Sequence, residues 1–266
     1  MMPERTEYPP GTFCWIDLGT TDLAGAKEFY GELFGWTFED QPAGPDMEYA
    51  IVKLKGKDVA AAYQMNSEMM ETGIPTHWLS YVSTADADAT SKNAEELLGN
   101  IIQPTFDVHS VGRVAVLQDN VGAVFAVFQP GGHHGAQLVN EHGTLCWNEM
   151  GTTAANKSSE FYSKLFGWTA ETQQMGEMNY TSFVNQGRPA AGMYVLTAEM
   201  LSQGIPPNWL VYFAVDDADA TAAKVESLGG HIVTPLTDIP EVGRFAVAED
   251  PQGGHFAFIK LVNPPD

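Results

Sequence analysis

Residues 28–36 read EFYGELFGW, and residues 160–168 read EFYSKLFGW, with seven identities in nine positions. Other segments recur at nearly the same offset: GTFCW at 11–15 and GTLCW at 143–147, GIPTHWLSYV at 73–82 and GIPPNWLVYF at 204–213, and DADAT at 86–90 and 217–221. Repetition at a fixed offset is the signature of a duplicated structural unit. The sequence therefore predicts two homologous domains, 8–130 and 140–262, joined by a linker at 131–139 that is rich in glycine and histidine.

A fainter repeat lies inside each domain. DLAGAKEFYGELFG at 22–35 and DADATSKNAEELLG at 86–99 share an acid at the start, a helix-forming stretch, and a leucine close to a final glycine. The first predicts an amphipathic helix that Asp22 caps at its N-terminus and Gly35 at its C-terminus. Short alternating runs precede and follow each helix and predict strands. Each domain thus contains two strand–helix–strand–strand–strand units (βαβββ modules). The predicted class is α+β, with curved mixed sheets around a cavity and helices outside.

The charge and the cysteines limit the partners and the compartment. The chain of 266 residues has 13 basic and 34 acidic residues, for a net charge of −21. Such a surface gives no counterion release on nucleic acid and is repelled by anionic membranes, so we expect neither as a partner. No apolar run is long enough for a membrane helix, and no signal peptide is recognisable. Cys14 and Cys146 occupy equivalent positions and are expected to be reduced thiols in strands. A cytoplasmic location is the default prediction.

The doubled module has a recognisable pattern. The helix motif DL…FY…LFGW follows the first strand, and a late turn reads Asp250-Pro-Gln-Gly253. This arrangement resembles the vicinal-oxygen-chelate superfamily, which includes glyoxalase I, bleomycin-resistance proteins and extradiol dioxygenases. The tandem form with CW and GIP-x-x-W is most similar to bacterial glyoxalase-like proteins that carry a hydroxylase label. The resemblance implies two glyoxalase-like domains, each formed by two βαβββ modules.

The resemblance also implies where metal ligands would lie. In metal-using relatives, His, Gln or Glu fills a position on the first strand of each module and another near the end of its last strand. The matching first-strand positions here are Trp15, Leu79, Trp147 and Leu210, and the matching last-strand positions are Ala126 and Ala257. The other last strands, within 59–67 and 188–197, contain no Asp or Glu. We therefore predict that the family metal site is lost from both domains and that no cofactor is bound.

Strand alternation predicts which side chains face the cavities, because residues two apart share a face. The candidates are Trp15, Asp17, His77 and Tyr81 in the first domain, and Trp147, Glu149, Asn208, Tyr212 and His255 in the second. Either the tryptophans fill the core or they form an aromatic wall for a flat ligand. Either Asp17 and Glu149 accept structural hydrogen bonds or they act as a general base with a raised pKa.

Other polar residues have equally open interpretations. His77 and His255 are either hydrogen-bonded edge residues or site residues, and Glu149 with His255 could form a displaced metal site. Histidines 133, 134 and 142 are expected to be solvated. Arg113 and Arg244 recur in V-G-R and could bind an anionic substrate group or pair with acids.

Four functions follow. The first is a metal-free protein that binds a small, partly aromatic molecule in cavities lined by Trp15 and Trp147. The second is a metal-independent lyase, isomerase or hydroxylase that uses Glu149 or Asp17 as acid or base. The third is a metal-dependent glyoxalase or dioxygenase, and the fourth is a structural protein with filled cavities. No motif of a serine hydrolase, nucleotide-binding protein or zinc protease occurs. Assembly into a homodimer stays open.

Overall fold

The computed structural model describes residues 4–42, 48–108, 110–176 and 178–263, and it forms two eight-stranded mixed sheets. Sheet A has the order β2 (Thr37–Pro42), β3 (Glu48–Leu54), β4 (Lys57–Gln64), β1 (Phe13–Thr20), β5 (His77–Ser83), β8 (Val124–Pro130), β7 (Gly112–Gln118), β6 (Asn100–Val108). Sheet B has the order β10 (Thr169–Met175), β11 (Met178–Asn185), β12 (Arg188–Val195), β9 (Thr144–Thr152), β13 (Asn208–Ala214), β16 (His255–Leu261), β15 (Gly243–Glu249), β14 (His231–Ile239). The helices are α1 (Leu23–Phe34), α2 (Ser67–Glu71), α3 (Ala87–Glu96), α4 (Ala155–Phe166), α5 (Ala198–Ser202) and α6 (Ala218–Ser227).

The strand order confirms the four βαβββ modules. In each domain the first strands of the two modules lie side by side and antiparallel, β1 with β5 and β9 with β13. Each first strand also pairs in parallel with the last strand of its own module, as β1 does with β4. The short helices α2 and α5 join the two modules of each domain. The centre of each sheet is therefore made of first and last strands.

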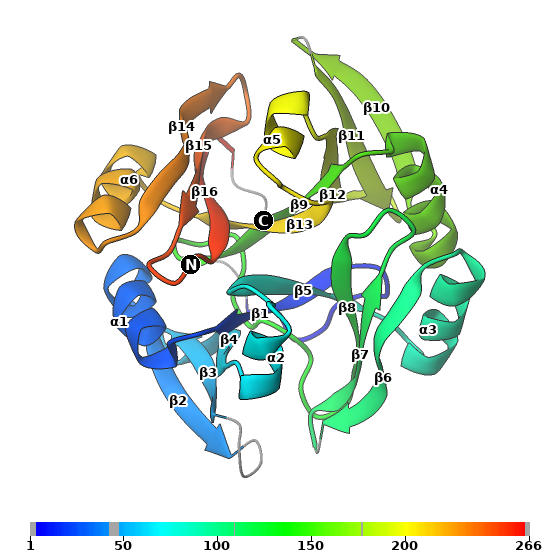
Figure 1. Ribbon diagram of the computed structural model, residues 1–266, viewed down its shortest axis with the longest axis horizontal. Helices are drawn as coiled ribbons and strands as arrows, with labels where there is room; N and C mark the ends of the chain where they lie inside the picture. The colour runs from blue at the N-terminus through cyan, green and yellow to red at the C-terminus, as the bar shows by residue number, and fades with distance from the viewer. Residues whose placement is uncertain (1–3, 43–47, 109, 177, 264–266) are drawn as a thin grey trace.

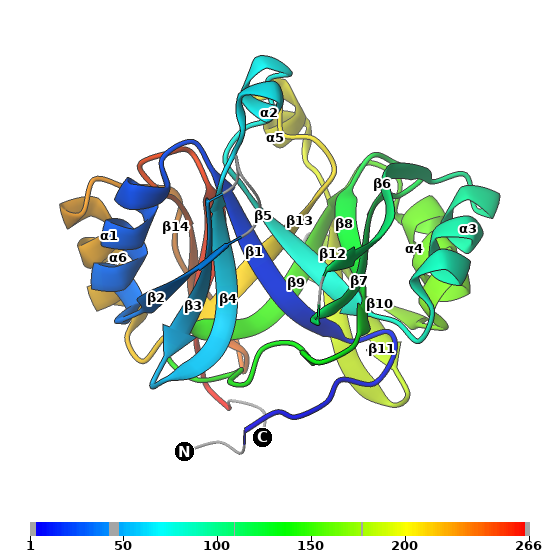
Figure 2. The ribbon, with the colours of Figure 1, turned by 90° about the horizontal axis from the view of Figure 1, so that it is seen from below.

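The two sheets curve away from each other (Figure 1). Their convex faces are turned toward each other, and the four long helices lie on this side, α1 beside α6 and α3 beside α4. The concave faces point in opposite directions (Figure 1). Helices α2 and α5 project from one side of the molecule, and the chain ends lie on the other side (Figure 2). Each domain thus presents one concave sheet face that no long helix covers.

Helix α1 forms where the sequence predicts it. The side chain of Asp22 accepts a hydrogen bond from the backbone N–H of Gly25 at 3.0 Å, which caps the first turn. Gly35 ends the helix in the left-handed conformation, with φ of 74°, where glycine has no steric penalty. The apolar side of the helix, including Phe29, Tyr30 and Leu33, is buried. The helix therefore packs by the face that the three-four spacing indicated.

The buried cores cross the domain boundary. Tyr30 of α1 donates to Asp250 of the second domain at 2.8 Å and accepts from Trp78 at 3.0 Å. The repeat of this arrangement joins Tyr162 to Asp119 at 3.0 Å and to Trp209 at 2.8 Å. The FY motif and the D-x-x-G turn thus hold the two domains together.

Two further predictions concern membrane-spanning helices and the cysteines. Among the described residues, no helix is both long and apolar enough to cross a membrane. Cys14 in β1 and Cys146 in β9 are free, as their equivalent positions in separate domains indicated.

Candidate functional site

The concave face of sheet A gathers aromatic and small apolar side chains around Trp15. This tryptophan is 7% exposed and packs in a cluster with Ala61, Val114 and Phe128. Strand pairing places Trp15 beside Tyr81 of β5. Because Asp17 is two residues further along β1, its side chain lies on the same face. The structure therefore brings Trp15, Asp17 and Tyr81 together as the alternation predicted.

Asp17 is the buried carboxylate of this face. It is 4% exposed, and its Oδ2 accepts a hydrogen bond from the Tyr81 hydroxyl at 2.6 Å. Its Oδ1 is buried and has no hydrogen-bond partner among the described residues. Burial raises the pKa of Asp17 to about 7, and the hydrogen bond from Tyr81 offsets part of this shift. The group can therefore exist in either protonation state near neutral pH.

Two tyrosines beside Asp17 were not among the predicted site residues. The negative charge of Asp17 contributes to raising the pKa of Tyr49 and of Tyr63, after burial itself. Trp15 is a hydrogen-bond partner of Tyr49. A signal was present in the sequence, because both tyrosines recur 131 residues later as Tyr180 and Tyr194. Tyr49, Tyr63 and Tyr81 therefore surround Asp17, and the charge of Glu149 likewise contributes to raising the pKa of Tyr194, after burial.

In sheet B the same cluster forms around Glu149, which keeps some surface exposure. Its Oε1 accepts from the Tyr180 hydroxyl at 2.9 Å, and its Oε2 accepts from the Tyr212 hydroxyl at 2.6 Å. Trp147 donates its indole N–H to the Tyr180 hydroxyl at 3.2 Å. Burial raises the pKa of Glu149, while the hydrogen bonds from Tyr212 and Tyr180 lower it in part. Both oxygens of this carboxylate are thus bonded within the protein.

The remaining predicted residues lie toward the ends of the central strands. His77 begins β5, is half-buried and has its Nδ1 2.8 Å from the carbonyl oxygen of Pro75; burial lowers its pKa. Its counterpart Asn208 donates to the Pro206 carbonyl at 2.8 Å. His255 is exposed at the start of β16. Among the described residues, no group of three or more His, Cys, Asp or Glu could hold a metal ion.

One linker histidine is less exposed than the sequence predicts. His133 was expected to be solvated, yet its side chain is only 24% exposed. Its ring packs edge-on against Trp15, with centroids 4.8 Å apart and planes at 83°. Its Nε2 lies 3.6 Å from a carboxylate oxygen of Asp58. The physical reason is that the linker hydrogen-bonds along β1, through the N–H of Ala136 to the carbonyl of Cys14 at 2.8 Å. The linker therefore covers part of the concave face beside Trp15.

The residues at the positions where the resemblance predicts metal ligands do not fit a divalent metal ion. Trp15, Leu79 and Ala126 offer indole, isobutyl and methyl groups on the concave face, and none of these is a metal ligand. The nearby carboxylate of Asp17 is instead bonded to a tyrosine hydroxyl. The arrangement provides hydrogen-bonding and aromatic groups, and we assign no chemical step to a metal.

The repeated arginines are engaged in ion pairs. Arg113 pairs with Asp88 and with Asp107, whose oxygen is 3.0 Å from its Nε. Arg244 pairs in the same way with Asp219 at 2.9 Å and Asp238 at 3.0 Å. Of the two predicted roles of these arginines, the geometry agrees with pairing to acidic residues.

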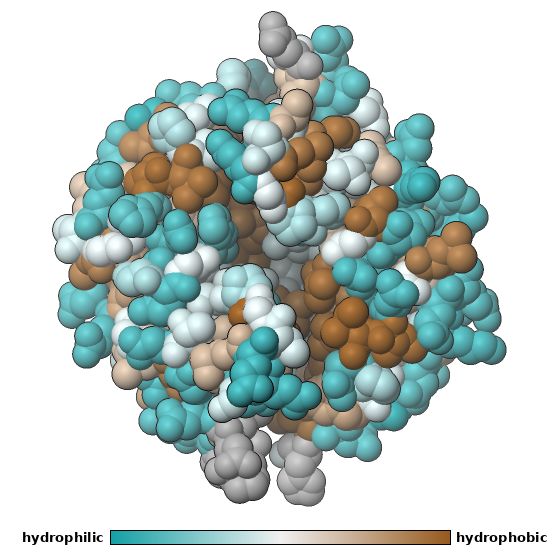
Figure 3. Space-filling view, in the orientation of Figure 1, coloured by the Kyte–Doolittle hydropathy of each residue, from teal (hydrophilic) through white to brown (hydrophobic). Residues whose placement is uncertain are grey.

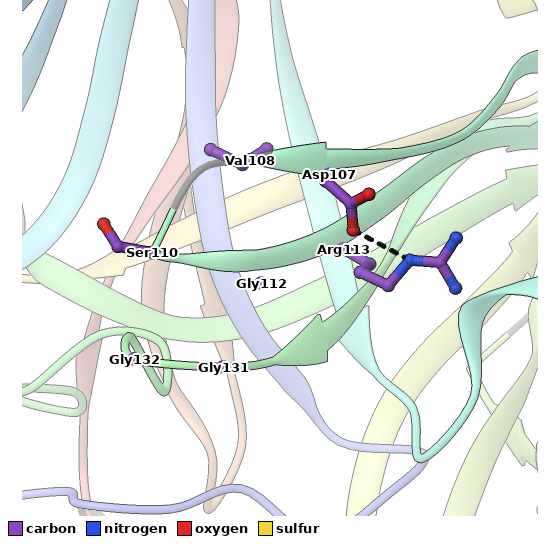
Figure 4. A pocket seen from close by; sticks show the side chains of 7 residues that line it. All are labelled: Asp107, Val108, Ser110, Gly112, Arg113, Gly131 and Gly132. Carbon is purple, nitrogen blue, oxygen red and sulfur yellow. Dashed lines mark hydrogen bonds and ion pairs between the residues drawn. The ribbon is translucent and has the colours of Figure 1, made fainter.

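The surface of the molecule also has a pocket and a hollow. A pocket of about 300 Å³ lies at the β6–β7 hairpin end, where Arg113 is directed to Asp107 (Figure 4). Its lining residues are Asp107, Val108, Ser110, Gly112, Arg113, Gly131 and Gly132. The molecule is also hollowed near the centre of the face shown in Figure 3, with hydrophobic residues along the hollow. The pocket offers no aromatic wall, unlike the concave faces around Trp15 and Trp147.

Comparison with known proteins agrees with this architecture. The family model described as Glyoxalase/Bleomycin resistance protein/Dioxygenase superfamily matches residues 12–152 and 144–258. The chain is 40% identical over 260 residues to "Putative glyoxylase CFP32" of Mycobacterium tuberculosis, covering 97% of this chain and 98% of that protein. It is 34% identical over 270 residues to the anthracycline biosynthesis protein DnrV of Streptomyces peucetius, covering 96% and 95%.

Solved structures share the fold at low sequence identity. The chain is similar to 2,2',3-trihydroxybiphenyl 1,2-dioxygenase of Sphingomonas wittichii, with a TM-score of 0.65, 13% identity and coverage of 95% of this chain and 91% of that one. It is also similar to the Mn(II)-bound glyoxalase of Novosphingobium aromaticivorans, with a TM-score of 0.64, 15% identity and coverage of 97% and 84%. The match to the family model and the 40% identity to the mycobacterial relative show that the chain belongs to the glyoxalase/bleomycin resistance protein/dioxygenase superfamily.

Proposed function

We propose that this protein binds a small, partly aromatic molecule on its concave sheet faces, and that it does so without the metal ion of its metal-using relatives. The observation that carries the proposal is the cluster of one tryptophan, one carboxylate and three tyrosines on each concave face. Aromatic walls with a few placed polar groups are typical of small-molecule sites. Tyrosine and tryptophan offer flat apolar area together with a hydrogen-bonding atom.

The relatives are compatible with this ligand class. DnrV is named for anthracycline biosynthesis, and anthracyclines contain fused aromatic rings. On each concave face, a site made of Trp15 or Trp147 with the tyrosines of the same face suits rings of this kind. We infer that the ancestral metal ligands were replaced by side chains that contact such a ring.

A titration of chelator-treated protein tests the proposal. Calorimetry with 2-methoxynaphthalene, a flat aromatic probe, is expected to show saturable binding that EDTA does not change. Trp15→Leu and Trp147→Leu are each expected to remove the binding that belongs to their own cavity. A requirement for one equivalent of a divalent metal would contradict the proposal, as would binding that neither substitution alters.

A second candidate function is a metal-independent enzyme in which Asp17 transfers protons. It is favoured by the pKa of Asp17, which burial raises to about 7, a value suited to general acid–base catalysis near neutral pH. The probe 2-tetralone carries acidic C–H bonds next to an aromatic ring. Its hydrogen exchange in D₂O, followed by NMR, is expected to be accelerated by the wild-type protein and not by Asp17→Asn. Equal rates for both proteins would contradict this candidate.

A further inference from the structure

The two concave faces differ in how their carboxylates are bonded. In domain 2, hydroxyl groups of Tyr180 and Tyr212 satisfy both oxygens of Glu149, at 2.9 and 2.6 Å. In domain 1, the Tyr81 hydroxyl satisfies only Oδ2 of Asp17, at 2.6 Å. Oδ1 is buried without a partner among the described residues. A buried acceptor without a donor is unfavourable, which makes this atom an unusual feature that calls for an explanation.

The difference has a local steric cause. Gly192 is the strand neighbour of Glu149, and Ala61 is the strand neighbour of Asp17. The Tyr180 hydroxyl oxygen lies where a side chain at residue 192 would be, only 1.8 Å from the position of an added Cβ. At the matching place in domain 1, the methyl group of Ala61 fills this space. Tyr49, the counterpart of Tyr180, therefore cannot approach the carboxylate along the same path.

The shorter acidic side chain of domain 1 also contributes to the unpaired oxygen. Asp17 is one methylene shorter than Glu149, so its oxygens stay closer to β1. The hydroxyl of Tyr49 interacts with the indole of Trp15. Two substitutions between the copies, Glu to Asp and Gly to Ala, thus leave one oxygen of domain 1 without its tyrosine.

We propose that Oδ1 of Asp17 accepts a hydrogen bond from a ligand bound in domain 1, and that this ligand carries a hydroxyl or N–H group on a flat aromatic ring. The inference rests on the proposed function and deepens it, because it names one domain and one ligand chemistry. In domain 2 the Tyr180 hydroxyl takes the place of the ligand donor.

The surroundings of Asp17 suit such a ligand. Trp15 and Leu79, both 7% exposed, flank the carboxylate along the central strands. Tyr49 and Tyr81 are half-buried, so part of each ring faces accessible space. The linker closes the far side of Trp15 through His133. A hydrogen bond formed in such a dry site is stronger and more selective than one formed in water.

A pair of probes that differ only in the donor tests the inference. Calorimetry of the wild-type chain compares 2-naphthol, which carries a hydroxyl donor, with 2-methoxynaphthalene, which has the same ring and no donor. We expect 2-naphthol to bind at least tenfold more tightly at one site per chain. Equal affinity for the two probes would contradict the inference and leave the proposed function standing. If neither probe binds, the proposed function itself is contradicted and the inference falls with it.

Substitutions locate the tight site. Asp17→Leu is expected to abolish the tenfold advantage of 2-naphthol, because leucine fills a similar volume without an acceptor. The matched control is Asp238→Leu, which changes an exposed carboxylate that pairs with Arg244 away from both concave faces. It is expected to leave both affinities within twofold. An unchanged advantage in Asp17→Leu would overturn the assignment to domain 1.

A second variant tests the steric cause without touching domain 1. In Gly192→Ala the new methyl group must displace the Tyr180 hydroxyl and free Oε1 of Glu149. We expect a second 2-naphthol site per chain with a similar preference over 2-methoxynaphthalene. An unchanged stoichiometry of one would contradict the explanation by Tyr180, and with it the inference.

Discussion

The interface between the domains and the two concave faces were built by the same duplication, yet they differ in how closely the copies agree. At the interface Tyr30 and Tyr162 make matching hydrogen bonds to an aspartate and a tryptophan, all between 2.8 and 3.0 Å. On the concave faces, Asp17 stands for Glu149 and Ala61 for Gly192. The copies are alike where they pack against each other and differ around the carboxylates. The two domains therefore differ in the hydrogen bonding of their carboxylates, on their concave faces.

The largest expected effect concerns the interface. Tyr30→Phe and Tyr162→Phe each remove a hydroxyl that donates to a buried aspartate and accepts from a buried indole. We expect each substitution to lower the free energy of unfolding by ~2 kcal/mol, since buried partners are left unsatisfied. Urea unfolding measures both variants. If the losses of unfolding free energy in the two variants differed severalfold, the two copies of the interface would not be equivalent.

The second effect is the pH dependence of the stability that Asp17 contributes. Burial raises the folded-state pKa of Asp17 from 3.8 to about 7, and Tyr49, Tyr63 and Tyr81 are the titratable groups that interact with it. The folded state thus holds the proton more tightly than the unfolded state. The resulting stability is fully present below pH 3.8 and is lost as the pH rises to about 7.

Asp17→Asn is expected to remove this part of the pH dependence. Relative to the wild type, the variant should gain stability as the pH rises from 4 to 8. Chemical unfolding across this range, with Glu149→Gln measured in parallel, checks the expectation. A wild-type pH profile that Asp17→Asn leaves unchanged would contradict the buried state of this carboxylate.

A smaller effect tests the Gly–Ala difference through stability. Gly192→Ala is expected to lower the free energy of unfolding by about 1–2 kcal/mol, because the Tyr180 hydroxyl occupies the space that the methyl group needs. The additional variant Gly192→Ala/Tyr180→Phe should recover part of this loss, since it removes the clashing oxygen. Thermal unfolding of both variants is the measurement. No recovery in the double variant would mean that another contact causes the loss.

The smallest effect is expected at the repeated arginines. Arg113→Gln and Arg244→Gln break exposed ion pairs with neighbouring aspartates. Exposed pairs contribute little, so ligand affinity and the unfolding midpoint should stay within experimental error. A clear loss of affinity in either variant would restore the alternative that these arginines bind an anionic group.

The fold could be predicted because the repeats constrain it at several levels. The capping residues Asp22 and Gly35, the alternating strands and the four-fold module recurrence all indicate the same architecture. Alternation also placed Asp17 with Trp15, and Glu149 with Tyr212, on one face. These inferences depend on capping residues, side-chain alternation and repeats, which can be read from the sequence.

Other features depend on contacts between distant segments. Tyr49 and Tyr63 reach Asp17 from strands whose register relative to β1 is set by tertiary pairing. His133 meets Trp15 because the linker forms hydrogen bonds along β1, which its composition, rich in glycine and histidine, does not indicate. The role of the FY motif at the interface likewise requires both domains. We attribute the unpaired oxygen of Asp17 to the methyl group of Ala61. Strand alternation alone does not show which side chains this methyl group excludes.

A crystal structure of the chelator-treated protein grown with 2-naphthol tests the central claim most directly. We expect the naphthalene ring beside Trp15, with its hydroxyl oxygen within hydrogen-bond distance of Oδ1 of Asp17. A metal ion bound on the concave face of sheet A, or a ring found only beside Trp147, would contradict it.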